Sequence, residues 1–211
     1  MRRASGRRGA WLLVVSVVVG NAALQAATTL PAVTPGSSLS FWALAATSGV
    51  SVVLALAAVL GRMRAMELGA SAGSANLGDV EEREISGDRP GRFAASSALF
   101  ALLVTLIVGL AAVLWSPLVL LTVPLGLIAA ASWVATGGVY RGLRVFTRRP
   151  WAAAMLAVLS VGVVALLWLG ALFSGFFIAG WFSALVTWLA FGFVGTGLLA
   201  TWSRLMKPRP A

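Results

Sequence analysis

The chain has 211 residues, of which 60% are hydrophobic and 10% are charged. Because soluble globular domains carry about 25% charged residues, this composition excludes a water-soluble fold. The formal net charge is +10, and the chain contains neither Cys nor His. The absence of these two residue types excludes disulfides, thiolate catalysis, haem ligation and the usual zinc and copper sites. We therefore expect no cofactor and no metal site.

Three uncharged runs divide the chain, at residues 9–61, 93–140 and 150–203. A helix rises about 1.5 Å per residue and a bilayer core is about 30 Å thick, so about 20 apolar residues make one crossing. Each run is long enough for two crossings. The pattern predicts an all-α, polytopic integral membrane protein with six transmembrane helices arranged as three hairpins.

Turn-forming residues near the middle of each run divide it into two spans. The turns are expected at residues 31–38, at Ser116-Pro117 and near residues 173–175. The predicted spans are residues 10–30, 41–60, 93–115, 117–140, 151–172 and 176–202. A basic tail, residues 1–9, precedes them, a mobile loop at residues 61–92 connects the first two hairpins, and residues 203–211 form a second tail.

The positively charged residues follow one rule of membrane topology. Arginines and the single lysine occupy the two tails and the segments 61–92 and 141–149, whereas the three predicted turns carry no charge. The positive-inside rule therefore places both termini in the cytoplasm. The basic excess is explained by anionic lipid headgroups rather than by nucleic acid. Fifteen Arg against one Lys in an Ala-, Val-, Leu- and Gly-rich chain is typical of a high-GC bacterium, so we expect its plasma (inner) membrane.

The first apolar stretch follows a basic tail, a pattern that also describes a signal peptide. Leu24 and Gln25 interrupt the small-residue pattern that a cleavage site at Ala26 would need, so we predict an uncleaved span. Asn21, Gln25 and Thr28 or Thr29 recur at three- and four-residue spacing and share one helix face. This face is interpreted either as hydrogen-bonding glue between helices or as a contact for a polar ligand.

Hydroxyl residues in the second span are expected to bond to their own helix. These are Thr47, Ser48 and Ser51. In the loop that follows, Glu81, Glu82 and Glu84 lie close together, but no His and no EF-hand spacing accompanies them. A solvated charge run is the simpler interpretation of these carboxylates. The alternative is a docking surface for a cytoplasmic partner.

Two features mark the second hairpin and the segment after it. Pro124, with Gly126 beside it, lies inside the fourth span, where a proline removes a backbone hydrogen bond and is expected to kink the helix. The following basic segment is short. We expect it to contact anionic lipid headgroups or an anionic partner through Arg141, Arg144, Arg148 and Arg149.

The residues provide no catalytic set, so we do not expect an enzyme. The spans also lack the ionisable groups that proton- and sodium-coupled transporters keep in the membrane. The sequence therefore favours the membrane-embedded permease or substrate-binding subunit of a transporter that a partner, such as an ABC-type ATPase, energises. The alternative is a non-transporting scaffold, assembly or regulatory subunit of a membrane complex.

In length, number of spans and placement of its ends, the chain resembles the substrate-binding components of energy-coupling factor transporters. Ala22 and Ala26 are similar to the Ala-x-x-x-Ala motif by which that family docks its partner. The resemblance implies a six-helix substrate-binding subunit, although no substrate-site residue can be matched. Six-span permeases of ABC exporters share the same outline.

Overall fold

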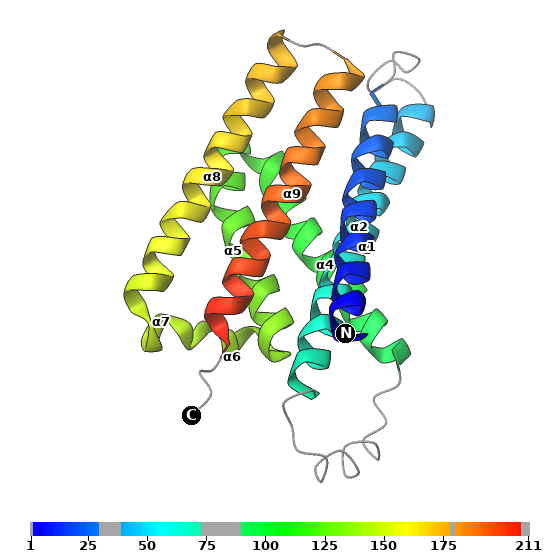
Figure 1. The fold of residues 1–211 in the computed structure, drawn as a ribbon. Helices are drawn as coiled ribbons and strands as arrows, with labels where there is room; N and C mark the ends of the chain where they lie inside the picture. Colours follow the sequence, from blue (N-terminus) through cyan, green and yellow to red (C-terminus); the bar gives the residue numbers. More distant parts are fainter. Residues whose placement is uncertain (1, 30–38, 73–89, 178–179, 208–211) are drawn as a thin grey trace.

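The computed structural model describes residues 2–29, 39–72, 90–177 and 180–207, and every regular element in these ranges is a helix. Six helices in this described part are long and apolar enough to cross a membrane. They confirm the predicted all-helical class and the predicted number of spans. Their bounds are α1 Arg2–Ala27, α2 Leu39–Ala72, α4 Pro90–Leu114, α5 Val119–Thr136, α8 Pro150–Phe177 and α9 Trp181–Met206 (Figure 1).

Helix α5 is the central element of the bundle. It packs against α2, α4, α8 and α9, while α1 packs against α2 and α9, and α2 packs against α4 (Figure 1). One face of α5 is accordingly buried over much of its length, including Pro124, Ile128, Ala131 and Val134. The six long helices therefore form one bundle rather than separate pairs.

A cluster of buried hydrophobic residues lies toward the end of the bundle that carries the charged segments. It joins the end of α2 to the ends of α5 and α9 through residues that include Leu60, Met63, Val134 and Trp202. Trp202 is fully buried, and its indole Nε1 donates a hydrogen bond of 3.0 Å to Ser160 Oγ on α8. This buried hydrogen bond fixes α9 against α8 near the charged end.

The outside of the bundle is apolar. Ile107 and Leu110 on α4 remain about 60% and 61% exposed, and many Leu, Val and Phe side chains on the other long helices are similarly uncovered. A soluble monomer rarely exposes contiguous apolar surface of this extent. Such a surface fits the hydrocarbon of a bilayer.

Several helix bounds at the charged end differ from the sequence prediction, since α1 begins at Arg2, α4 begins at Pro90 and α9 ends at Met206. Helix α2 continues to Ala72, so residues 61–72 of the predicted mobile loop are helical, and residues 73–89 lie outside the described ranges. Helix α5 ends at Thr136 instead of residue 140. Gly137 closes it in the left-handed conformation (φ 78°), with its N–H donating to the carbonyl of Trp133 at 2.9 Å.

The predicted turn at residues 173–175 is also helical, because α8 runs on to Phe177. Ser174 Oγ lies 2.9 Å from Ser183 Oγ and 3.1 Å from Thr187 Oγ1, both on α9. These cross-helix hydrogen bonds use the serine that the sequence pattern suggests for a turn. Gly180, with φ 103°, then precedes α9.

Three short helices complete the described structure. They are η2 Ser116–Leu118, before α5, and α6 Val139–Leu143 and α7 Val145–Arg148, which follow it. Most of the basic segment that follows the fourth predicted span, expected as a short loop, is thus helical. In Figure 1, α6 and α7 lie at the same end of the bundle as the start of α1 and the ends of α2 and α9.

Candidate functional site

The polar face of α1 meets the hydroxyls of α2. The side-chain amide of Gln25 donates to the carbonyl of Ser48 at 3.0 Å and to Ser51 Oγ at 2.9 Å, and Ser48 Oγ donates to Gln25 Oε1 at 2.6 Å. Ser51 Oγ also lies 2.9 Å from Asn21 Oδ1, to which it donates. We call these four residues, Asn21, Gln25, Ser48 and Ser51, the α1–α2 polar cluster.

Both the nitrogen and the oxygen of the Gln25 side-chain amide are hydrogen-bonded within the cluster, and only 3% of Gln25 is exposed. Thr28 and Thr29 do not join it, because their hydroxyls donate to the carbonyls of Gln25 and Ala26 at 2.7 Å. The expectation that the α2 hydroxyls bond only to their own helix holds for Thr47, which donates to the carbonyl of Ala43. Ser51 also donates to its own helix, at the carbonyl of Ser48 (3.0 Å), but both Ser48 and Ser51 bond to α1 as well, which the sequence did not predict. Of the two interpretations of the α1 face, this geometry fits hydrogen bonding between helices.

Replacing Gln25 by leucine is expected to lower the free energy of unfolding by about 1 kcal/mol, since hydrogen bonds between membrane helices contribute about 0.6 to 1.7 kcal/mol. A double-mutant cycle with Ser51→Ala, measured by SDS-induced unfolding in mixed micelles, isolates the pair. Thr47→Ala is the matched control, because Thr47 is exposed and bonds only locally. A coupling of zero between Gln25 and Ser51 would contradict the cluster.

Pro124 is buried within α5, and the helix continues through it. Proline has no N–H to donate, so the helix lacks one backbone hydrogen bond at this position. The kink at Pro124 stays a prediction. Gly126 lies on the side that faces α4. A Cβ atom at this position would meet Val104 Cγ1 at 3.1 Å, so Gly126 allows α4 and α5 to approach closely.

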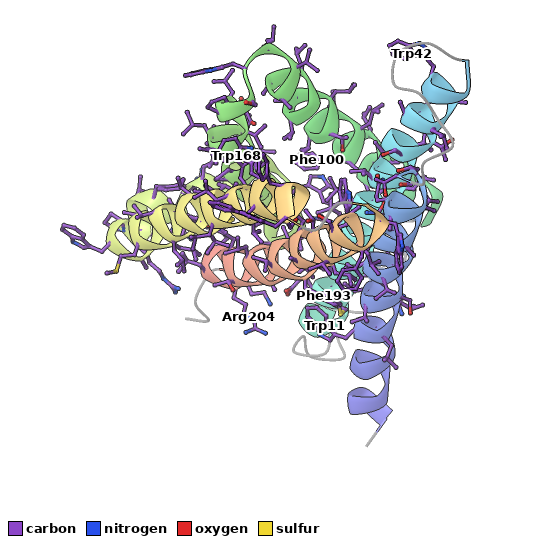
Figure 2. All side chains as sticks on the ribbon, turned by 90° about the horizontal axis from the view of Figure 1, so that it is seen from above. Trp11, Trp42, Phe100, Trp168, Phe193 and Arg204 are labelled. Carbon is purple, nitrogen blue, oxygen red and sulfur yellow. The ribbon has the colours of Figure 1, made fainter. Side chains whose placement is uncertain are left out.

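The four arginines of the basic segment fall into two groups. Arg141, Arg144 and Arg148 are exposed, whereas Arg149 is half-buried at the start of α8. Arg149 lines a groove with Arg204 of α9, and Figure 2 shows Arg204 extending from α9 away from the bundle. The acidic residues Glu81, Glu82 and Glu84, interpreted as a solvated charge run or alternatively as a docking surface for a partner, lie outside the described ranges.

Arg64 forms a contact that sequence reasoning missed. Its Nη1 donates to the carbonyl of Trp133, and its Cζ lies 5.0 Å from the centroid of the Trp133 ring. The ring of Phe100 stacks on the Trp133 ring, and the two ring centroids are 5.8 Å apart. The positive guanidinium therefore meets both an aromatic face and the negative C-terminal end of α5.

Spacing along α2 is the signal that could have revealed this contact. Arg64 and Glu67 follow the buried residues Leu60 and Met63 at helical intervals, which places all four on one face of an extended helix. Glu67 forms an ion pair with Lys207, just beyond α9. The Lys207 side chain is 43% exposed, so this pair links the two helix ends but contributes little stability.

Ser132 anchors the short helix α6 to α5. The backbone N–H of Gly142 donates to Ser132 Oγ at 3.0 Å, and this hydroxyl lies 2.8 Å from the carbonyl oxygen of Gly138. Ser132 and Gly142 are both buried. This contact fixes the direction in which the chain leaves α5 and therefore positions the basic residues that follow.

No protein-family model matches the chain, and no curated protein and no solved structure is similar to it. The class of protein is therefore indicated by its own helices. Six apolar helices of membrane-spanning length, with an apolar outer surface, indicate a multi-pass membrane protein.

Ala22 and Ala26 of α1 are buried inside the bundle, whereas a motif that docks a partner is exposed. Ala22 is fully buried and Ala26 is 4% exposed, on the helix that packs against α2 and α9. Val18, one turn earlier, packs so closely on α9 that a Cβ atom at Gly192 would lie 2.4 Å from Val18 Cγ1. The chain's own helices thus cover the surface that the resemblance to energy-coupling factor components would assign to a partner.

Proposed function

We propose that the six long helices cross the plasma membrane of a high-GC bacterium as three hairpins, with both termini in the cytoplasm. The distribution of charge supports this orientation. The arginines and lysine of the described part of the chain lie on the starts of α1 and α4, the ends of α2 and α9, and the segment from α6 to the start of α8, which share one end of the bundle (Figure 1). Basic segments of this kind are retained on the cytoplasmic side.

We further propose that the chain is the membrane-embedded subunit of a larger complex and depends on a protein partner. The observation that carries this proposal is the absence of Lys, Arg, Asp, Glu and His from residues 9–61, 93–140 and 150–203. A chain without ionisable groups at mid-membrane lacks the residues that proton- and sodium-coupled transporters normally keep there. A partner that supplies energy or function would act at the charged end, where the guanidinium groups of Arg141, Arg144 and Arg148 are exposed.

Two forms of this proposal differ in what the subunit does. In the first, it is the permease or substrate-binding subunit of a transporter that an ABC-type ATPase energises. In the second, it is a non-transporting scaffold, assembly or regulatory subunit. The α1–α2 polar cluster favours the second form, because its polar groups bond to one another and leave the buried Gln25 amide engaged at both ends. In both forms the chain has no catalytic activity of its own.

Co-purification tests the dependence on a partner. We expect the full chain, extracted from its native membrane in a mild detergent, to retain a partner in fixed stoichiometry. Replacing Arg141, Arg144 and Arg148 together by glutamine is expected to reduce the retained partner at least ten-fold without changing the size-exclusion profile of the chain. The matched control replaces the same three residues by lysine, which keeps the charge and is expected to keep most of the partner.

The identity of the partner separates the two forms. An ATPase that co-purifies and whose activity depends on this chain supports the transporter form, whereas a different multi-subunit assembly supports the scaffold form. Recovery of a stable chain without any co-purifying partner would contradict both forms.

A further inference from the structure

A groove with a volume of about 510 Å³ lies between the cytoplasm-facing halves of α8 and α9, and this assignment of sides rests on the proposed orientation. It is distinct from the α1–α2 polar cluster and from the Arg64–Trp133 contact. Its lining is mainly apolar, with two cationic side chains. The residues that line it are Arg149, Ala152, Met155, Leu156, Leu159, Thr201, Arg204 and Leu205.

The charges of the groove lie at one end. Arg149 is the residue before α8, and Arg204 lies in the last turn of α9, so both belong to the cytoplasmic end of the bundle. The lining contains no acidic residue. Two guanidinium groups without a lining carboxylate form a site that is complementary to a phosphate, which arginine binds through paired N–H donors.

The apolar part of the groove has the length of one lipid leaflet. Leu159 lies ten residues after Arg149 along α8. At about 1.5 Å per residue this separation is about 15 Å, which is half of a bilayer core of about 30 Å. Met155 and Leu159 are 75% and 55% exposed along this path, and Ala152 lines the groove about one helical turn after Arg149. The groove therefore begins at the headgroup level and ends near the bilayer midplane.

We propose that this groove binds one anionic phospholipid of the cytoplasmic leaflet. The headgroup phosphate lies between Arg149 and Arg204, and an acyl chain follows Met155, Leu156 and Leu159 toward the midplane. Basic sites between transmembrane helices on the cytoplasmic side are suited to such headgroups. The lipid holds α8 to α9 at the end of the bundle where α7 and the basic segment join α8.

The experiment uses the full chain purified in detergent and titrated with phosphatidylglycerol in a background of phosphatidylcholine, with bound lipid counted by native mass spectrometry. We expect one phosphatidylglycerol molecule to bind in preference to phosphatidylcholine. Arg149→Gln and Arg204→Gln are each expected to reduce this preference about five-fold, the effect expected for one basic residue near an anionic membrane surface. Arg62→Gln, an exposed arginine on α2 that lies outside the groove, is the matched control and is expected to change it less than two-fold.

A second variant separates a groove from a charged surface. Ala152→Trp fills part of the groove without changing the charge, and it is expected to abolish the preferential binding while the size-exclusion profile is unchanged. Retention of phosphatidylglycerol by Ala152→Trp, or an equal loss of preference in Arg62→Gln, would overturn the proposal. Displacement of the lipid by millimolar inorganic phosphate would also overturn it, because the site would then bind a soluble anion. This assay contains no protein partner, so its failure leaves the proposed subunit role intact, and failure of co-purification leaves the lipid site intact.

Discussion

Replacing Gly142 by alanine is expected to lower the free energy of unfolding by about 3 kcal/mol, at the upper end of the range for an overpacked core. A Cβ atom at Gly142 would lie 2.1 Å from Ser132 Oγ and 2.8 Å from the Cα atom of Ser132. The second distance involves the backbone of α5, so a side-chain rotation does not relieve the clash. Helix α6 must move away, which breaks the hydrogen bond from the Gly142 N–H to Ser132 Oγ.

SDS-induced unfolding in mixed micelles measures this loss. Gly162→Ala on α8 is the matched control, since a Cβ atom at Gly162 meets nothing within 4 Å. We expect the control to be as stable as the wild type or slightly more stable, because alanine favours the helix. Equal stability of the two variants would show that α6 does not pack on Ser132 as described.

Replacing Arg64 by methionine is expected to lower the free energy of unfolding by about 2 kcal/mol, the contribution of a charged hydrogen bond together with a cation–π contact. The substitution keeps much of the apolar stem but removes the guanidinium from the Trp133 carbonyl and from the Trp133 ring. The carbonyl still accepts the N–H of Gly137, so α5 keeps its terminal hydrogen bond and the loss remains local.

Arg64→Lys distinguishes geometry from charge. Lysine keeps the positive charge near the end of α5 but has no planar group to lie over the indole, so an intermediate loss of about 1 kcal/mol is expected. Arg62→Met is the control for charge alone, because Arg62 is exposed on the same turn of α2. If Arg64→Met and Arg62→Met lost equal stability, the Arg64–Trp133 contact would contribute nothing.

The number and type of long helices could be predicted from the sequence because the uncharged runs that indicate them are long. Uncharged runs at residues 9–61, 93–140 and 150–203 each accommodate two crossings of a bilayer core. Individual ends were less predictable where a distant contact competes with a local signal. Ser174 looks like a turn residue in the sequence but bonds to Ser183 and Thr187 across the helix interface, and α8 continues past it.

The sequence predicted which residues of a candidate site share one helix face, but not which residues of other helices lie opposite them. The spacing of Asn21 and Gln25 places both on one face of α1, but it does not say that Ser48 and Ser51 lie opposite them. The contact from Arg64 to Trp133 joins residues 69 positions apart, on two helices that are not consecutive. Such pairings arise from the packing of α1 on α2 and of α2 on α5, and no local pattern encodes them.

In the proposed orientation the chain crosses the membrane six times and keeps every charged segment on one side. The chain contains no natural cysteine, so a single introduced cysteine reports its own side of the membrane without interference. In intact spheroplasts, a membrane-impermeant maleimide is expected to label Ser116→Cys, between the third and fourth spans. Ser5→Cys, Thr147→Cys and Lys207→Cys are expected to react only after permeabilisation. Labelling of Ser5→Cys and Lys207→Cys from opposite sides of the membrane would contradict the six-span account.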